Sequence, residues 1–184
     1  MISQGEGNWP QNFNKVLKKA TGDFIKYLHE DDMLTSNCIN DSVEALLLQN
    51  VDFIHGNAIE IDQISGNQVS WVPIIKEPTF YEMIKKNFIH SATLMYRREI
   101  FEKIGSFDES AKMLSFEEYE FNLRCLSNGF TLGYCDSFLA YYRRHNRQII
   151  RSVDKRKRTE NRNDIVKKYW DALQNGTTCI GYGH

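Results

Sequence analysis

Three consecutive acids, Glu30, Asp31 and Asp32, follow a short apolar segment of the chain. That segment, residues 24–28, is introduced by Gly22 and is rich in aromatic and aliphatic side chains, which predicts a buried strand. Carboxylates crowded at the end of a core strand are costly unless a cation or strong hydrogen-bond donors meet them. Oxygen ligands of this kind bind Mg2+ or Mn2+, often together with substrate phosphates. For the triplet taken alone, a solvated acidic turn is the alternative.

A second acidic group, Glu117, Glu118 and Glu120, lies near the start of a segment with helical spacing of its apolar residues, 116–126. Ser115 and Glu118 have the spacing of a capping box, and acids near a helix start suit the helix dipole, so a structural role is open. A carboxylate near a helix start also tends to stay ionised at neutral pH, as a general base must.

Basic residues Arg143, Arg144 and His145 follow a predicted strand, residues 138–142. Arginine can hold phosphate oxygens, and a basic edge strand is the alternative. Residues 143–168 contain eleven lysines or arginines and three acids, although the net charge of the whole chain is −1. Such a block is usually a solvated face, but it can contact an anionic substrate, nucleic acid or an acidic membrane surface.

Helical and strand-like apolar spacings alternate along the chain, and they predict the elements that must position these groups. Residues 1–11 are polar and predict a loop. Helices are predicted over 12–20, around 43–50, and over 79–87, 99–104, 116–128 and part of 151–184. Strands are predicted over 24–28, 51–55, 92–96, 130–134 and 138–142, with a hairpin formed by 58–62 and 68–73.

Composition indicates one globular domain with a real core, because the 184 residues are 41% hydrophobic and 12% aromatic. No apolar run is long enough to span a membrane, and the first residues lack a signal-peptide pattern. The four cysteines show no Cys-x-x-Cys spacing, so neither zinc nor a disulfide framework is indicated. We therefore expect reduced, buried cysteines and a cytoplasmic location, with the inner face of the membrane as a further option.

Together these segments resemble family 2 glycosyltransferases of the GT-A type, from about residue 14 to about residue 145. Residues 22–34 resemble the family's Asp-x-Asp region, and residues 117–124 resemble its Glu-Asp-Tyr-Asp-x-x-x-Arg element, with Glu118 and Glu120 in place of the two aspartates. The stretch 87–108 is similar to its strand, Arg, helix, Gly-Gly-Phe-Asp element. Residues 142–145 are similar to its Tyr-Arg-x-His terminus.

The resemblance implies an α/β fold, a GT-A (Rossmann-like) mixed sheet flanked by helices. Residues 1–150 would form the GT-A-like domain, and residues 151–184 a basic amphipathic helix and tail. The family normally opens with about half of a nucleotide-binding sheet, and no such segment precedes Met1. We therefore expect a partial domain, the carboxyl-terminal part.

The implied activity is transfer of a sugar from a nucleotide-diphospho-sugar, with UDP-sugars expected first, to a hydroxyl of a glycan or lipid-linked acceptor. The reaction would invert the anomeric centre and depend on Mg2+ or Mn2+. In the family's terms Glu118 is the catalytic base, and the metal ligands are Asp31 and Asp32. The residues expected to bind substrate are Glu30, Glu117, Arg143, Arg144 and His145.

Two other functions are considered. A catalytically silent GT-A fragment would act through association with another chain, and should expose an apolar sheet edge. A nucleic-acid or membrane-surface binder would use the basic residues 143–168 and show steeply salt-dependent binding. Nothing else in the sequence favours nucleic acid, so we expect no nucleic-acid partner. A peripheral membrane contact or an oligomer stays open.

Overall fold

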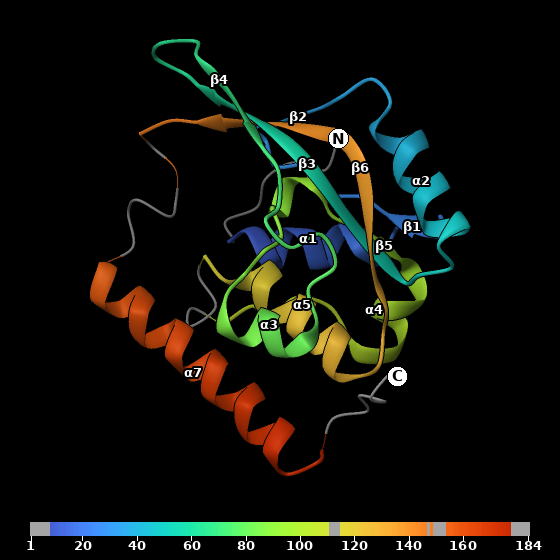
Figure 1. Ribbon diagram of the computed structural model, residues 1–184, viewed down its shortest axis with the longest axis vertical. Coiled ribbons are helices and arrows are strands. Elements are labelled where there is room, and N and C mark those ends of the chain that lie inside the picture. Colours follow the sequence, from blue (N-terminus) through green and yellow to red (C-terminus); the bar gives the residue numbers. More distant parts are fainter. Residues whose placement is uncertain (1–7, 111–114, 147, 149–153, 178–184) are drawn as a thin grey trace.

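A mixed sheet forms the centre of the protein, seen in a computed structural model that describes residues 8–110, 115–146, 148 and 154–177 (Figure 1). Within these residues the sheet has six strands in the order β1-β5-β3-β6-β2, and β4 pairs with β3 outside this order. The strands are β1 (Phe24–Ile25), β2 (Met33–Leu34), β3 (Phe53–Asp62), β4 (Gln68–Trp71), β5 (Met95–Arg97) and β6 (Leu132–Arg144).

The two longest strands, β3 and β6, run parallel, whereas the other pairs are antiparallel. Their register shifts around Gly56 and Asn57. A Cβ on Gly56 would lie 2.7 Å from both the Cys135 carbonyl oxygen and the Leu139 side chain, so the close approach requires glycine. The sequence predicted two separate strands within β3, residues 51–55 and 58–62, and two within β6, residues 130–134 and 138–142. A β-bulge keeps each pair as one continuous strand instead.

Helices cover both faces of the sheet (Figure 1). The helices are α1 (Trp9–Leu17), α2 (Cys38–Leu48), α3 (Phe80–Lys85), α4 (Arg98–Ile104), α5 (Glu117–Ser127) and α7 (Lys155–Gln174), with a 3-10 turn, η1 (Ser91–Thr93). Helix α2 packs with Ile54, Met95 and Leu139 in a small core. The other α-helices share a larger, aromatic-rich core with Phe53 and Tyr96.

Several predicted element starts are wrong. Helix α2 begins at Cys38 rather than near residue 43, and β5 begins at Met95 rather than at residue 92, because residues 91–93 form η1. Helix α1 begins at Trp9 rather than at residue 12, because Asn8 and Gln11 form a capping box and Pro10 fits the first turn. Ser115 does not cap α5: the N-cap residue is Phe116, and no side chain caps it. Ser115 has a left-handed φ of 75°, and its buried hydroxyl has no hydrogen-bond partner among the described residues.

Helix α7 lies along one edge of the molecule and packs against α3 and α5 (Figure 1). It buries Ile165 and Tyr169, as its amphipathic spacing predicts. The carboxylate of Glu120, only 2% exposed, accepts hydrogen bonds from Tyr169 Oη (2.6 Å), Lys168 Nζ (3.0 Å) and Arg124 Nη2 (3.2 Å). The basic helix is therefore tied to the helix that carries Glu117 and Glu118.

Cysteines 38, 125 and 135 are buried free thiols, as predicted, and Cys179 lies outside the described residues. Among the described helices, none combines the length and apolar character that crossing a membrane requires.

Candidate functional site

Pairing of β2 with β6 brings the acidic turn beside the basic end of β6, because Met33 faces Tyr141 in the register. Asp31 Oδ2 lies 2.7 Å from His145 Nε2. The backbone N–H of Arg143 donates to Asp32 Oδ1 at 3.1 Å. Two predicted metal ligands and two predicted substrate-binding residues, more than 100 positions apart in the sequence, are thus in direct contact.

Asp32 is only 6% exposed, and its Oδ2 has no hydrogen-bond partner among the described residues. Burial raises its pKa to about 6, and the charge of Asp31 adds to this against the Arg143 hydrogen bond. A buried, unpaired carboxylate oxygen beside a second carboxylate fits a divalent cation. No group of three His, Cys, Asp or Glu in the described residues forms a ready-made metal site.

The remaining residues of this half lie around the turn. Glu30 is exposed in it. The guanidinium of Arg144 lies 3.1 Å from Glu60 Oε2 across the β3–β6 pair. Together with the contacts of Arg143 and His145, this places all three predicted phosphate-binding residues next to a carboxylate.

The second acidic centre lies in the first turn of α5. Glu118 Oε1 is 3.2 Å from His29 Nε2, and the two side chains are 16% and 20% exposed. Glu117 is buried beside it. Burial and the charge of Glu118 raise the pKa of Glu117 to about 7, so Glu117 holds its proton more tightly than an exposed carboxyl does.

His29 lies between the two acidic centres. Its ring packs against Trp9 and Tyr27, with centroid separations of 5.0 and 5.4 Å, and the Trp9 indole N–H contacts it. Burial lowers the pKa of His29, but the hydrogen bond and charge of Glu118, with Asp32 and Asp31, raise it above 6.5 overall. The charges of both acidic centres therefore act on the pKa of the His29 side chain.

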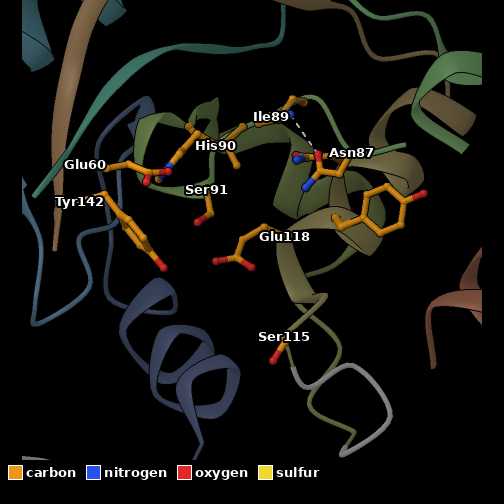
Figure 2. A pocket seen from close by; sticks show the side chains of 11 residues that line it. Glu60, Asn87, Ile89, His90, Ser91, Ser115, Glu118 and Tyr142 are labelled. Carbon is orange, nitrogen blue, oxygen red and sulfur yellow. Dashed lines mark hydrogen bonds between the residues drawn. The ribbon is translucent and has the colours of Figure 1, made fainter. Parts of the chain in front are cut away.

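A pocket of about 290 Å3 opens beside Glu118 (Figure 2). In the figure the Glu118 carboxylate points into the space between Ser91 and Tyr142. Its polar lining includes Glu60, Asn87, His90, Ser91, Ser115, Glu118, Asn122 and Tyr142. His90 packs edge-on against Trp71 and Tyr142, and burial lowers its pKa to about 4, so its ring is neutral near pH 7.

Sequence reasoning missed His29, Glu60 and Tyr142 as site residues. His29 directly precedes the acidic triplet, so its place at the end of the strand was a usable signal. Glu60 and Tyr142 are neighbours only because of the parallel register of β3 and β6, and no local sequence pattern predicts that register.

Comparison with known proteins identifies similar chains. Residues 1–105 match glycosyl transferase family 2. An uncharacterized glycosyltransferase of Haemophilus influenzae is 29% identical over 118 residues, which cover 61% of this chain and 43% of that protein.

Solved structures agree on the fold. The crystal structure of S. aureus TarS 1-349 in complex with UDP-GlcNAc has a TM-score of 0.68 and 18% identity, covering 98% of this chain and 50% of that one. A second crystal structure of S. aureus TarS 1-349 has a TM-score of 0.64 and 16% identity, covering 98% of this chain and 48% of that one. The chain spans about half the length of these relatives or less. The predicted GT-A mixed α/β fold is confirmed.

Proposed function

Because the chain belongs to glycosyl transferase family 2, we propose that it transfers a sugar from a UDP-sugar to an acceptor hydroxyl. The observation that carries this is the position of Glu118, whose side chain lines a polar pocket and contacts His29, a residue whose pKa also responds to the charges of Asp31 and Asp32. TarS, which shares the fold, has been crystallised with UDP-GlcNAc, and this supports a UDP-sugar as the donor.

The donor half of the site is assigned to the acidic turn and the end of β6. Asp31 and Asp32 would hold Mg2+ or Mn2+, which would neutralise charge on the leaving diphosphate when bound. Glu30, Arg143, Arg144 and His145 would bind the donor. The arginines supply fork-shaped donors that match phosphate oxygens.

In the acceptor half, Glu118 removes the proton of the acceptor hydroxyl as its oxygen attacks the anomeric carbon. The bond from that carbon to the diphosphate oxygen breaks, and its electron pair leaves with the nucleoside diphosphate. A single in-line displacement of this kind inverts the anomeric centre. Glu117 is assigned to orienting the acceptor. The hydroxyl, amide and carboxylate groups of the pocket suit a glycan or the sugar of a lipid-linked acceptor.

Transfer by a Glu118→Gln variant tests the proposal. The amide keeps the shape of the side chain but cannot take the proton, so we expect kcat to fall about 10^2- to 10^4-fold. Binding of UDP should not change. The control is Glu44→Gln, an exposed glutamate of α2, which should transfer at the wild-type rate. Wild-type transfer by Glu118→Gln would refute the base assignment.

Association with another chain, without catalysis, is the second candidate function. It is favoured by the β3–β4 hairpin, which projects beyond the rest of the molecule (Figure 1) and exposes Ile64 (80%), Val69 (60%) and, just after it, Ile74 (84%). Light scattering across a concentration series would test it. A mass that stays at one chain, together with sugar transfer, would remove this alternative.

A further inference from the structure

We propose that His29 is a positioning residue that holds the carboxylate of Glu118 for proton removal, and that Trp9 fixes the ring of His29. The inference rests on the proposed function, because it assigns His29 to the half of the site that activates the acceptor. His29 lies in the acidic turn of the donor half, so the contact also joins the two halves.

The contact between His29 and Glu118 is short and sheltered. Nε2 and Oε1 are 3.2 Å apart, and at least four fifths of each side chain is buried, at 20% and 16% exposed. A hydrogen bond to a charged group is stronger in such a low-dielectric setting than in water. With Oε1 held by His29, the other oxygen of Glu118 is left to receive the acceptor proton.

Trp9 selects the tautomer that can make this bond. An indole N–H can only donate, so the ring nitrogen it meets must be an acceptor. Trp9 Nε1 lies within hydrogen-bond reach of both ring nitrogens of His29, 3.1 Å from Nε2 and closer to Nδ1. When Nδ1 accepts the indole N–H, the one hydrogen of a neutral imidazole is on Nε2. Nε2 is the atom that faces Glu118.

Trp9 is itself held firmly. Its ring stacks on Phe13 with an interplanar angle of 8° and packs edge-on against Tyr27 and Phe107. The capping box formed by Asn8 fixes the start of α1, where Trp9 is the first residue. The packed aromatic rings therefore fix the orientation of the Trp9 indole. The indole fixes the orientation of the His29 ring, and the ring fixes that of the Glu118 carboxylate.

Steady-state kinetics of three variants of the full chain test the proposal, with kcat and the donor KM measured in a UDP-sugar transfer assay. His29→Leu removes the hydrogen-bond donor to Glu118 and should lower kcat about 10- to 100-fold, with the KM for the UDP-sugar unchanged. His29→Gln places an amide N–H near Nε2 and should recover most of kcat. Trp9→Phe keeps the stacking but removes the indole N–H, and should lower kcat by less than His29→Leu.

The outcomes separate this inference from the proposed function. A wild-type chain that binds UDP-sugar but transfers nothing would defeat the proposed function itself. An active wild type with an unchanged kcat in His29→Leu would overturn only the positioning role. A raised donor KM with unchanged kcat would also overturn it, since His29 would then serve the donor.

One control variant, and two of the test variants themselves, distinguish the positioning role from a purely structural effect. Val16→Ala, on an exposed face of α1, should keep wild-type kinetics. If His29→Leu fails to fold, His29→Gln and Trp9→Phe decide the matter. A kcat for His29→Gln as low as that of a Glu118→Gln variant, or a wild-type kcat for Trp9→Phe, would contradict the chain of contacts.

Discussion

Burial distinguishes the acids of the site residue by residue. Asp32 and Glu117 are buried and have raised pKa values, whereas Asp31 and Glu118 are partly exposed and each contacts a histidine. Each acidic centre thus pairs a buried carboxyl with a more exposed one. For a transferase this arrangement suits one centre for cation and phosphate, and the other for proton removal.

The raised pKa of Glu117 predicts a pH-dependent stability. Its pKa is about 7 in the folded chain and 4.5 as the ordinary value, so the folded state binds the proton more tightly between these pH values. Stability is therefore lost as pH rises from about 4.5 to 7, by up to about 3 kcal/mol. Glu117→Gln cannot ionise, so urea unfolding at pH 5 and pH 8 should show a smaller difference than in the wild type.

The exposed Glu44→Gln serves as the control and should keep the wild-type pH dependence. An equal loss of stability between pH 5 and pH 8 in the wild type and in Glu117→Gln would contradict the burial argument.

Short motifs made several residues of the candidate site recognisable from the sequence, and their roles stay predictions. The acids at residues 30–32 and 117–118 and the basic residues 143–145 stand out because the chemistry needs crowded charges at element ends. The contact of Trp9 with His29, and the pairing of Glu60 with Arg144, were not predictable. These contacts join positions 20 and 84 residues apart, and no local pattern encodes them.

Helix α7 is joined to α5 by hydrogen bonds to the buried carboxylate of Glu120. Tyr169→Phe removes its shortest hydrogen bond, 2.6 Å, and leaves the charge with two partners. We expect a loss of about 1–3 kcal/mol in the free energy of unfolding, measured by urea denaturation. Tyr81→Phe, an exposed tyrosine of α3, should change it by less than about 0.5 kcal/mol. Equal effects of the two variants would contradict the role given to Glu120.

The β-bulge where β3 pairs with β6 leads to a prediction about Gly56. Gly56→Ala would force a methyl group against backbone and a core leucine at 2.7 Å, and should cost about 1–3 kcal/mol in thermal or urea unfolding. Gly22→Ala is the matched control, because the nearest atom there is 3.7 Å away and its φ is ordinary. If both variants were equally stable, the close approach at the bulge would not be a constraint.

Most element types followed from apolar spacing, but their ends did not. The sequence predicted the β3–β4 hairpin and α4 close to their observed bounds, since Gly66 and Gly105 mark them, but it placed the start of α2 near residue 43 rather than at Cys38. The two halves of β3, and those of β6, looked separate because a bulge resembles a turn in sequence. The expected cap of α5 was wrong, because Ser115 has a left-handed φ of 75° and Phe116 takes the N-cap position instead.

For the molecule as a whole, the sheet order places the acidic turn, the end of β6 and the start of α5 around one region. The division into residues 1–150 and 151–184 stays a prediction. So do a cytoplasmic location and a contact between the basic residues 143–168 and an anionic membrane. The chain spans about half the length of the TarS structures.

Calorimetric titration of the chain with UDP, with and without Mn2+, tests whether the acidic turn and the end of β6 form a metal-dependent donor site. We expect binding that strengthens with the metal, that is lost or strongly weakened in Asp31→Asn, and that persists in Glu118→Gln. Absence of binding by the wild-type chain, or equal binding by the wild type and Asp31→Asn, would contradict the account.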